Sequence, residues 1–124
     1  MINYLKKRLQ SFVYAFKGIS ILFSTQPNAQ IHLLAVIVIT ALGFLLGLNA
    51  TEWSIILICI ALVLLAEGMN TALEFLTDLV SPDIHPLAGK TKDVAAGAVL
   101  ISVIICGLVW GIIFLPKIWG FISR

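Results

Sequence analysis

Three long apolar stretches constrain this 124-residue chain more than any other feature of its sequence. Residues 31–48 are interrupted only by His32 and one threonine, and residues 94–115 contain a single polar side chain, a serine. Between them, an apolar run from Trp53 continues as a helical pattern of apolar residues. Because ~20 apolar residues in a helix cross the ~30 Å hydrocarbon core of a bilayer, we predict three transmembrane helices, over residues 31–48, 53–78 and 94–115. Pro116 is expected to end the third helix.

The composition excludes most other fold classes. Hydrophobic residues make up 60% of the chain and charged residues only 11%, against roughly 25% charged in an ordinary globular domain. A chain of this size cannot cover a water-exposed surface with so few polar groups, and it is too apolar to be disordered. The net charge of +2 is too small to indicate a nucleic acid partner. We therefore predict an all-α integral membrane protein that forms one domain over residues 1–124.

A different kind of helix is predicted before the first span, over residues 1–26. Its apolar residues recur at steps of four and three and form one stripe: Leu5, Leu9, Phe12, Phe16, Ile19 and Phe23. Lysines fall off that stripe, so the helix is typical of one that lies in the membrane surface. Six of the eight basic residues precede the first span or lie between the second and third, while Lys117 and Arg124 follow the third. This distribution favours a cytoplasmic N-terminus and a cytoplasmic loop over residues 79–93.

The second span carries polar residues that a lipid-facing helix should not have. Glu67, Asn70, Glu74 and Asp78 are spaced by three, four and four residues, so they share one strip within about 80° of arc, and Thr71 lies beside it. Carboxylates in a membrane are costly unless they are paired, metal-bound or facing water. A cation is therefore expected at this strip, although Asp78 alone could be a solvated interfacial residue and Asn70 alone a helix-packing amide.

The 79–93 loop adds charged and polar groups to the same membrane face. Lys92 and His85 are side chains that hold phosphate oxygens, while carboxylates such as Asp83 and Asp93 suit Mg²⁺. Beside the polar strip, these residues indicate a site for a nucleotide and a metal. Alone, they would be typical of a solvated connector, and Asp93 could cap a third helix that starts at residue 94. His32, at the start of the first span, is interpreted as an interfacial hydrogen-bonding residue.

Two motifs resemble one known family. The segment from Glu67 to Glu74 reads EGMNTALE and resembles the ExxNxxxE signature of the small bacterial diacylglycerol kinases and undecaprenol kinases. The HPLA segment that starts at His85, the following Lys92-Asp93 and the AAGAV segment over residues 95–99 resemble the next stretch of that family. The resemblance extends from the predicted surface helix to the end of the third span.

This resemblance implies an integral-membrane lipid kinase of the bacterial inner membrane that uses ATP and Mg²⁺. The family forms homotrimers with three spans and a surface helix per protomer, and its active sites are shared between subunits. By position, Glu67 would be the general base, Glu74 a metal ligand and Asn70 a residue that orders the site, supported by Asp78. The residues implied to contact ATP are Lys7, near the phosphates, and Tyr14, Asp83, His85, Lys92 and Asp93.

One position departs from the family pattern. A second glutamate ligand usually stands six residues before the histidine of the first span, and here that residue is Gln26. An amide oxygen can still coordinate Mg²⁺, but without a charge it should hold the ion more weakly. Since Mg²⁺ commonly relies on one or two carboxylates together with phosphates and waters, loss of activity does not follow.

Two alternatives come from other classes of protein. A small multidrug-type transporter would need an ionisable residue in mid-membrane, typically in the first span, yet residues 31–48 contain no carboxylate. A non-catalytic membrane assembly subunit would have no reason to gather Glu67, Glu74 and Lys92 at one face. The lipid acceptor stays open between diacylglycerol and undecaprenol, although the segments after His85 resemble the undecaprenol branch somewhat more.

Overall fold

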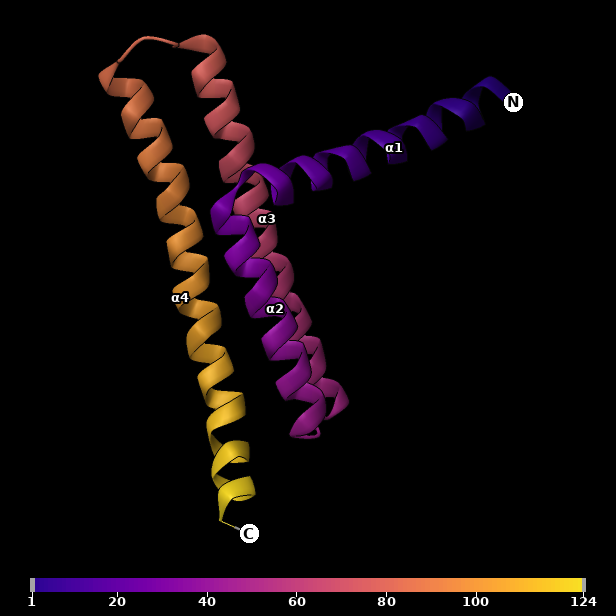
Figure 1. Cartoon of the computed structure of the whole chain (residues 1–124), viewed down its shortest axis with the longest axis vertical. Helices are drawn as coiled ribbons and strands as arrows, with labels where there is room; N and C mark the ends of the chain where they lie inside the picture. Colours follow the sequence, from indigo (N-terminus) through magenta and orange to yellow (C-terminus); the bar gives the residue numbers. More distant parts are fainter. Residues whose placement is uncertain (1, 124) are drawn as a thin grey trace.

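The computed structural model describes residues 2–123 and is helical through nearly all of them. Its four helices are α1 (Ile2–Thr25), α2 (Pro27–Leu45), α3 (Ala50–Val80) and α4 (Pro86–Ile122) (Figure 1). The prediction of an all-α chain is confirmed for this part of the sequence. The expectation for Arg124 lies outside the described residues.

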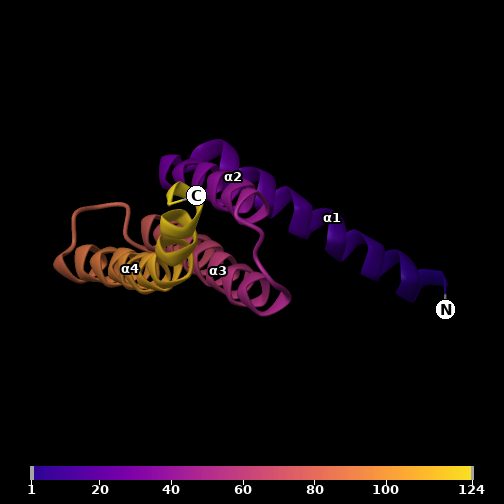
Figure 2. The ribbon, with the colours of Figure 1, turned by 90° about the horizontal axis from the view of Figure 1, so that it is seen from below.

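Helices α2, α3 and α4 run side by side, whereas α1 leaves them at a steep angle (Figures 1 and 2). Each of the three aligned helices is long and apolar enough to cross a membrane. Most of their large apolar side chains are exposed in the single chain, as expected for helices that face lipid or other protein. The apolar stripe of α1 is likewise exposed, except for Phe23, which is half-buried.

The apolar core joins the three long helices near the end that carries the α2–α3 turn. Ile39 of α2, Ile56 and Ile60 of α3, and Phe114 of α4 form one buried cluster. Further along the bundle, a smaller cluster that includes Cys59 and Cys106 connects α3 to α4. These contacts fix the spacing of α3 and α4 below the polar part of α3.

The helix ends follow from local chemistry. Pro27 occupies the first turn of α2, where its missing N–H is no loss. Asn49 and Glu52 form a capping box at the start of α3, with reciprocal hydrogen bonds of 2.9 and 2.8 Å between side chain and backbone. Gly47 has a φ of +64°, a conformation that glycine adopts without steric cost, in the turn before α3.

Helix α4 is longer at both ends than the predicted third span. It begins at Pro86, where the His85 Nδ1 accepts a hydrogen bond from the Leu87 N–H at 3.2 Å, so only residues 81–85 separate α3 from α4. The predicted cap at Asp93 is therefore wrong, because His85 and Pro86 start the helix earlier and Asp93 lies inside it.

The prediction that Pro116 ends the third span is also wrong. Helix α4 continues through Pro116 to Ile122. Proline is tolerated inside membrane helices when neighbouring groups compensate for the lost hydrogen bond. Here Lys117 forms a 3.1 Å ion pair with Glu52, and Ile118 packs against the core cluster. These tertiary contacts hold the turns that follow the proline.

Close packing at Gly43 gives a prediction about stability. A Cβ atom placed there would lie 2.6 Å from a ring carbon of Trp53, so Gly43→Ala must displace the indole. Such overpacking costs about 1–3 kcal/mol, and we expect a lower unfolding temperature in detergent micelles. The control is Gly120→Ala, where a Cβ meets nothing within 4 Å. An equal unfolding temperature for the Gly43 and Gly120 variants would contradict the packing of α2 on α3.

Candidate active site

Where α2, α3 and α4 come together, they line an open cavity of about 250 Å³, here called the polar cavity. Helix α3 contributes Glu67, Asn70 and Glu74 from three successive turns, and α2 contributes Asn28 and His32. The remaining lining is mostly apolar side chains of α4. The helical spacing that predicts a strip on α3 thus brings three of its four members to one cavity.

Glu67 is the most buried of these groups. Glu67 is 1% exposed, and its Oε2 has no hydrogen-bond partner. The nearest basic side chain is that of His32, whose Nε2 lies 3.9 Å from the Glu67 Oε2, which is too long for a hydrogen bond. A buried carboxyl group is costly unless it is paired and hydrogen-bonded. The structure therefore leaves one oxygen of Glu67 available to a molecule that enters the cavity.

Asn70 and Glu74 are linked to each other. The Asn70 Nδ2 donates a hydrogen bond of 3.1 Å to the Glu74 Oε1, which orients that carboxylate. The Asn70 Oδ1 is buried and has no partner. Two oxygens without partners, on Glu67 and Asn70, therefore line the cavity together with the Glu74 carboxylate.

This donor set fits Mg²⁺. Among residues 2–123, no group of three His, Cys, Asp or Glu side chains could hold a metal alone. Mg²⁺, however, prefers oxygen ligands, keeps several waters and needs only one or two carboxylates beside substrate phosphates. The polar cavity offers carboxylate and amide oxygens that lack internal partners, which is the chemistry that Mg²⁺ requires.

A second cleft of about 250 Å³, here called the charged cleft, lies at the α3–α4 connection. It is lined by Asp78, Asp83, His85 and Lys92, among others, and the Lys92 Nζ contacts the Asp78 Oδ1 at 2.5 Å. The structure thus brings these four sequence-predicted residues together. Asp78 has a definite partner, because it holds the Lys92 ammonium in this cleft.

The charged cleft and the polar cavity follow one another along the bundle. Asp78 lies one turn after Glu74 on α3, and Ala96, which lines the polar cavity, lies one turn after Lys92 on α4. A molecule with one end at Lys92 could therefore extend toward Glu74 between the same two helices.

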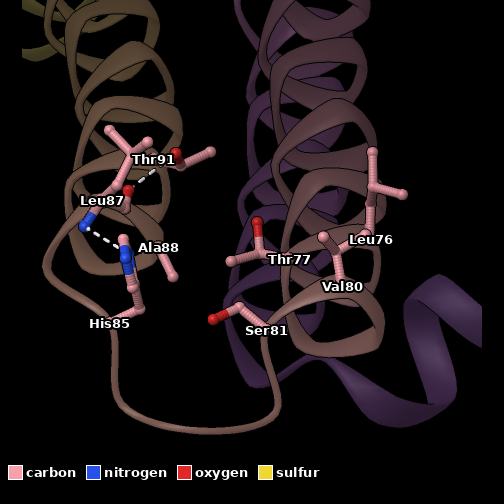
Figure 3. Close-up of a pocket in the computed structure, with 8 residues that line it drawn as sticks. All are labelled: Leu76, Thr77, Val80, Ser81, His85, Leu87, Ala88 and Thr91. Carbon is pink, nitrogen blue, oxygen red and sulfur yellow. Dashed lines mark hydrogen bonds between the residues drawn. The ribbon is translucent and has the colours of Figure 1, made fainter.

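An apolar pocket of about 420 Å³ adjoins the charged cleft. Figure 3 shows His85 and Ser81 on opposite sides of it, at the ends of α4 and α3, with Leu76 and Val80 on the α3 side. Since its Nδ1 accepts from the backbone of Leu87 (dashed in Figure 3), His85 presents its other ring nitrogen as a possible donor. His85 lines both the apolar pocket and the charged cleft.

Four of the predicted site residues line neither the polar cavity nor the charged cleft. Lys7 and Tyr14 lie on the part of α1 that projects away from the other helices (Figure 1). Gln26 precedes α2, and its Nε2 donates to the Thr25 Oγ1 at 3.4 Å. Asp93 is exposed on α4.

Two residues of α2 have a place in the site that sequence analysis missed or undervalued. Asn28 was not predicted to take part, and His32 was interpreted only as an interfacial residue, yet both line the polar cavity. Their spacing of four residues puts them on one face of a helix. That spacing was the available signal, but only the packing of α2 on α3 shows what the face meets.

Comparison with known proteins identifies relatives along nearly the whole chain. Residues 13–114 match the sequence model of the family described as prokaryotic diacylglycerol kinase. The undecaprenol kinase of Bacillus subtilis (strain 168) is 40% identical over 116 residues, which cover 94% of each protein. A diacylglycerol kinase of Synechocystis sp. is 40% identical over 111 residues, which cover 89% of this chain and 63% of that protein.

A more distant relative matches most of the chain at lower identity. The diacylglycerol kinase of Escherichia coli (strain K12) is 26% identical over 100 residues, which cover 81% of this chain and 82% of that protein. Residues 13–114, which match the family model, contain all the residues that line the polar cavity and the charged cleft. The chain therefore belongs to the prokaryotic diacylglycerol kinase family.

Proposed function

We propose that this protein is an ATP- and Mg²⁺-dependent lipid kinase of the bacterial inner membrane. It transfers the γ-phosphoryl group of ATP to the hydroxyl of diacylglycerol, giving phosphatidic acid, or of undecaprenol, giving undecaprenyl phosphate. Family membership supports an alcohol phosphotransferase, and three spanning helices support a multi-pass membrane location. The observation that carries the proposal is the buried Glu67, whose free oxygen lines a cavity that adjoins the Lys92 cleft.

Phosphoryl transfer depends mainly on positioning and charge neutralisation. The acceptor oxygen forms a bond to the γ-phosphorus, while the bond from that phosphorus to the β–γ bridging oxygen breaks and ADP leaves. Glu67 takes the proton of the acceptor hydroxyl. A general base must reach hydrogen-bond distance of that proton, and the Oε2 of Glu67 is free to do so because no internal donor occupies it.

The other residues hold the nucleotide and its metal. Mg²⁺ supplies neutralisation of phosphate charge when bound, and Glu74 would hold it together with the amide oxygen of Asn70. Lys92 and His85 hold phosphate oxygens from the charged cleft, near Asp83. The apolar pocket beside His85 is suited to the adenine ring.

A homotrimer would account for the residues that one protomer leaves apart. If active sites are shared between subunits, α1 of a second copy brings Tyr14 to the nucleotide and Lys7 to its phosphates. The uncovered apolar stripe of α1 and the exposed apolar surfaces of the long helices support such an assembly. Gln26 and Asp93 would complete the metal and nucleotide sites there.

The proposed orientation places the ATP-binding parts in the cytoplasm. The N-terminus and the 79–93 region carry six of the eight basic residues, and cytoplasmic segments are enriched in Lys and Arg. Family membership favours the kinase over the transporter and assembly-subunit alternatives. The direct test incubates purified protein with ATP, Mg²⁺ and each lipid alcohol separately, and measures phosphorylated lipid. Absence of product with both lipids would contradict the proposed function.

We predict that Glu67→Gln abolishes nearly all turnover, because glutamine cannot take the proton. General-base catalysis contributes about 10²–10⁴-fold to a rate, so a loss of at least about 100-fold in initial rate is expected. Glutamine has nearly the same shape, and the unfolding temperature should stay within a few degrees of the unmodified protein. Glu52→Gln, at the other end of the same helix, should retain turnover. Turnover near normal in Glu67→Gln would exclude Glu67 as the base.

We predict that Gln26→Glu lowers the Mg²⁺ concentration needed for half-maximal rate. A carboxylate attracts the ion more strongly than an amide oxygen, provided that residue 26 reaches the metal in the assembled protein. The measurement is the initial rate against Mg²⁺ concentration at fixed ATP. Gln10→Glu, which adds the same charge on α1, serves as the control. An unchanged or higher Mg²⁺ requirement for Gln26→Glu alone would show that residue 26 lies away from the metal.

A further inference from the structure

A fourth cavity, of about 380 Å³, lies between α1 and α3. Figure 1 shows that these two helices come near each other close to where α1 joins α2. Its lining is almost entirely apolar and includes Gly18 and Leu22 of α1 and Gly68 of α3. A Cβ atom added at Gly18 would meet nothing within 4 Å, and one at Gly68 only the Leu22 Cδ2 at 3.9 Å. The cavity, here called the glycine groove, therefore has open space beside both helix backbones.

One polar side chain stands out in the glycine groove. Thr71 is 4% exposed, and its hydroxyl is buried without a hydrogen-bond partner. Ser54 and Thr77 on the same helix instead donate to the carbonyl four residues earlier, at 2.8 and 2.7 Å. A buried donor without an acceptor costs free energy, and such a group in a folded protein calls for an explanation. The hydroxyl of Thr71 is therefore available to a ligand in the groove.

Thr71 lies one helical turn after Glu67, whose Oε2 also lacks a partner. Residues four apart on a helix differ by about 40° in direction, and their Cβ atoms lie roughly 5–6 Å apart. The two side chains line neighbouring cavities on adjacent faces of α3. An ionised carboxylate only accepts hydrogen bonds, whereas a threonine hydroxyl can donate one.

An alcohol hydroxyl can satisfy both residues together, because it has one hydrogen to donate and lone pairs that accept. We propose that Thr71 orients the reacting hydroxyl of the lipid acceptor, whose hydrocarbon chain lies in the glycine groove. This inference rests on the proposed lipid kinase function. Thr71 donates to the acceptor oxygen, the hydrogen of that oxygen passes to Glu67, and a remaining lone pair forms the bond to the γ-phosphorus.

The lining of the groove suits a lipid chain better than a nucleotide. It has no charged lining residue, so it is unsuited to the phosphates of a nucleotide, and it lies between a predicted surface helix and a predicted span. A chain that enters from the bilayer along α1 would bring its hydroxyl end to Thr71 and, one turn away, to Glu67.

The experiment compares Thr71→Val, which removes the hydroxyl at nearly constant volume, with Thr71→Ser, which retains it. Each purified protein is assayed with a short-chain diacylglycerol and a short-chain polyprenol. Loss of one hydrogen bond predicts a decrease of about tenfold in kcat/KM for both lipids in Thr71→Val. The KM for ATP should stay unchanged, and Thr71→Ser should keep near-normal rates. The unfolding temperature of Thr71→Val should not fall, because a buried unpaired hydroxyl has been removed.

Three outcomes would overturn the role of Thr71. The first is an unchanged kcat/KM in Thr71→Val, and the second is an equal loss of kcat/KM in Thr71→Ser. The third is a loss with diacylglycerol alone, which would show that the Thr71 hydroxyl donates to an ester carbonyl of the lipid instead of to its reacting hydroxyl. If the unmodified protein phosphorylated neither lipid, the proposed function would fail instead, so the two failures are distinguishable.

A second pair of variants tests the groove itself. A Cβ atom at Gly18 meets nothing within 4 Å, so Gly18→Leu adds its side chain in the open space of the groove. This variant should raise the KM for lipid several-fold while the KM for ATP is unchanged. Ser20→Leu adds the same side chain to α1 at a residue that does not line the groove and should leave both values unchanged. Equal lipid KM values for Gly18→Leu and the unmodified protein would exclude the groove as the binding place of the chain.

Discussion

Burial of the Glu67 carboxyl inside a membrane helix is the constraint on which the site depends. A carboxyl group that is removed from water without full pairing raises the free energy of the folded protein. The surrounding helices reduce this cost only in part, since His32 lies 3.9 Å away and the Oε2 stays without a hydrogen bond. The missing interactions are those that a hydroxyl, a cation or a phosphate-bound metal would provide.

The packed core and the candidate active site lie at opposite ends of the helical bundle. Near the α2–α3 turn, the core cluster around Ile56 and the ion pair between Glu52 and Lys117 hold α3 and α4 together. Toward the opposite end, the same two helices leave the polar cavity and the charged cleft between them. Because α3 is one continuous helix over 31 residues, the packing at one end sets the direction of Glu67 and Glu74 at the other.

The features that the sequence predicts correctly are those that depend on local periodicity. The spacing of Glu67, Asn70 and Glu74 on one helix fixes their common face before any tertiary contact is known, and the length of the apolar runs fixes the number of spans. The C-terminal end of α4 was predicted wrongly because it depends on contacts far apart in the chain, such as Lys117 with Glu52. The start of α4 is set locally by His85 and Pro86, a signal that the apolar run beginning at residue 94 does not contain. The sequence does not single out neutral residues such as Asn28 as site residues, because single amide side chains are common in apolar helices. The proposed places of Lys7 and Tyr14 in the site would require a neighbouring subunit, which the periodicity of one chain does not reveal.

The central claim is that ligands supply the partners that the buried oxygens of α3 lack. A molecule that binds only the folded protein raises its unfolding temperature in proportion to its binding free energy. The most direct measurement is the unfolding temperature in detergent micelles with and without Mg²⁺, a non-hydrolysable ATP analogue and a short-chain lipid alcohol. We expect a rise of several degrees in the unmodified protein and almost none in a Glu67→Gln, Glu74→Gln double variant. The same rise in both proteins, or none in the unmodified one, would contradict the claim.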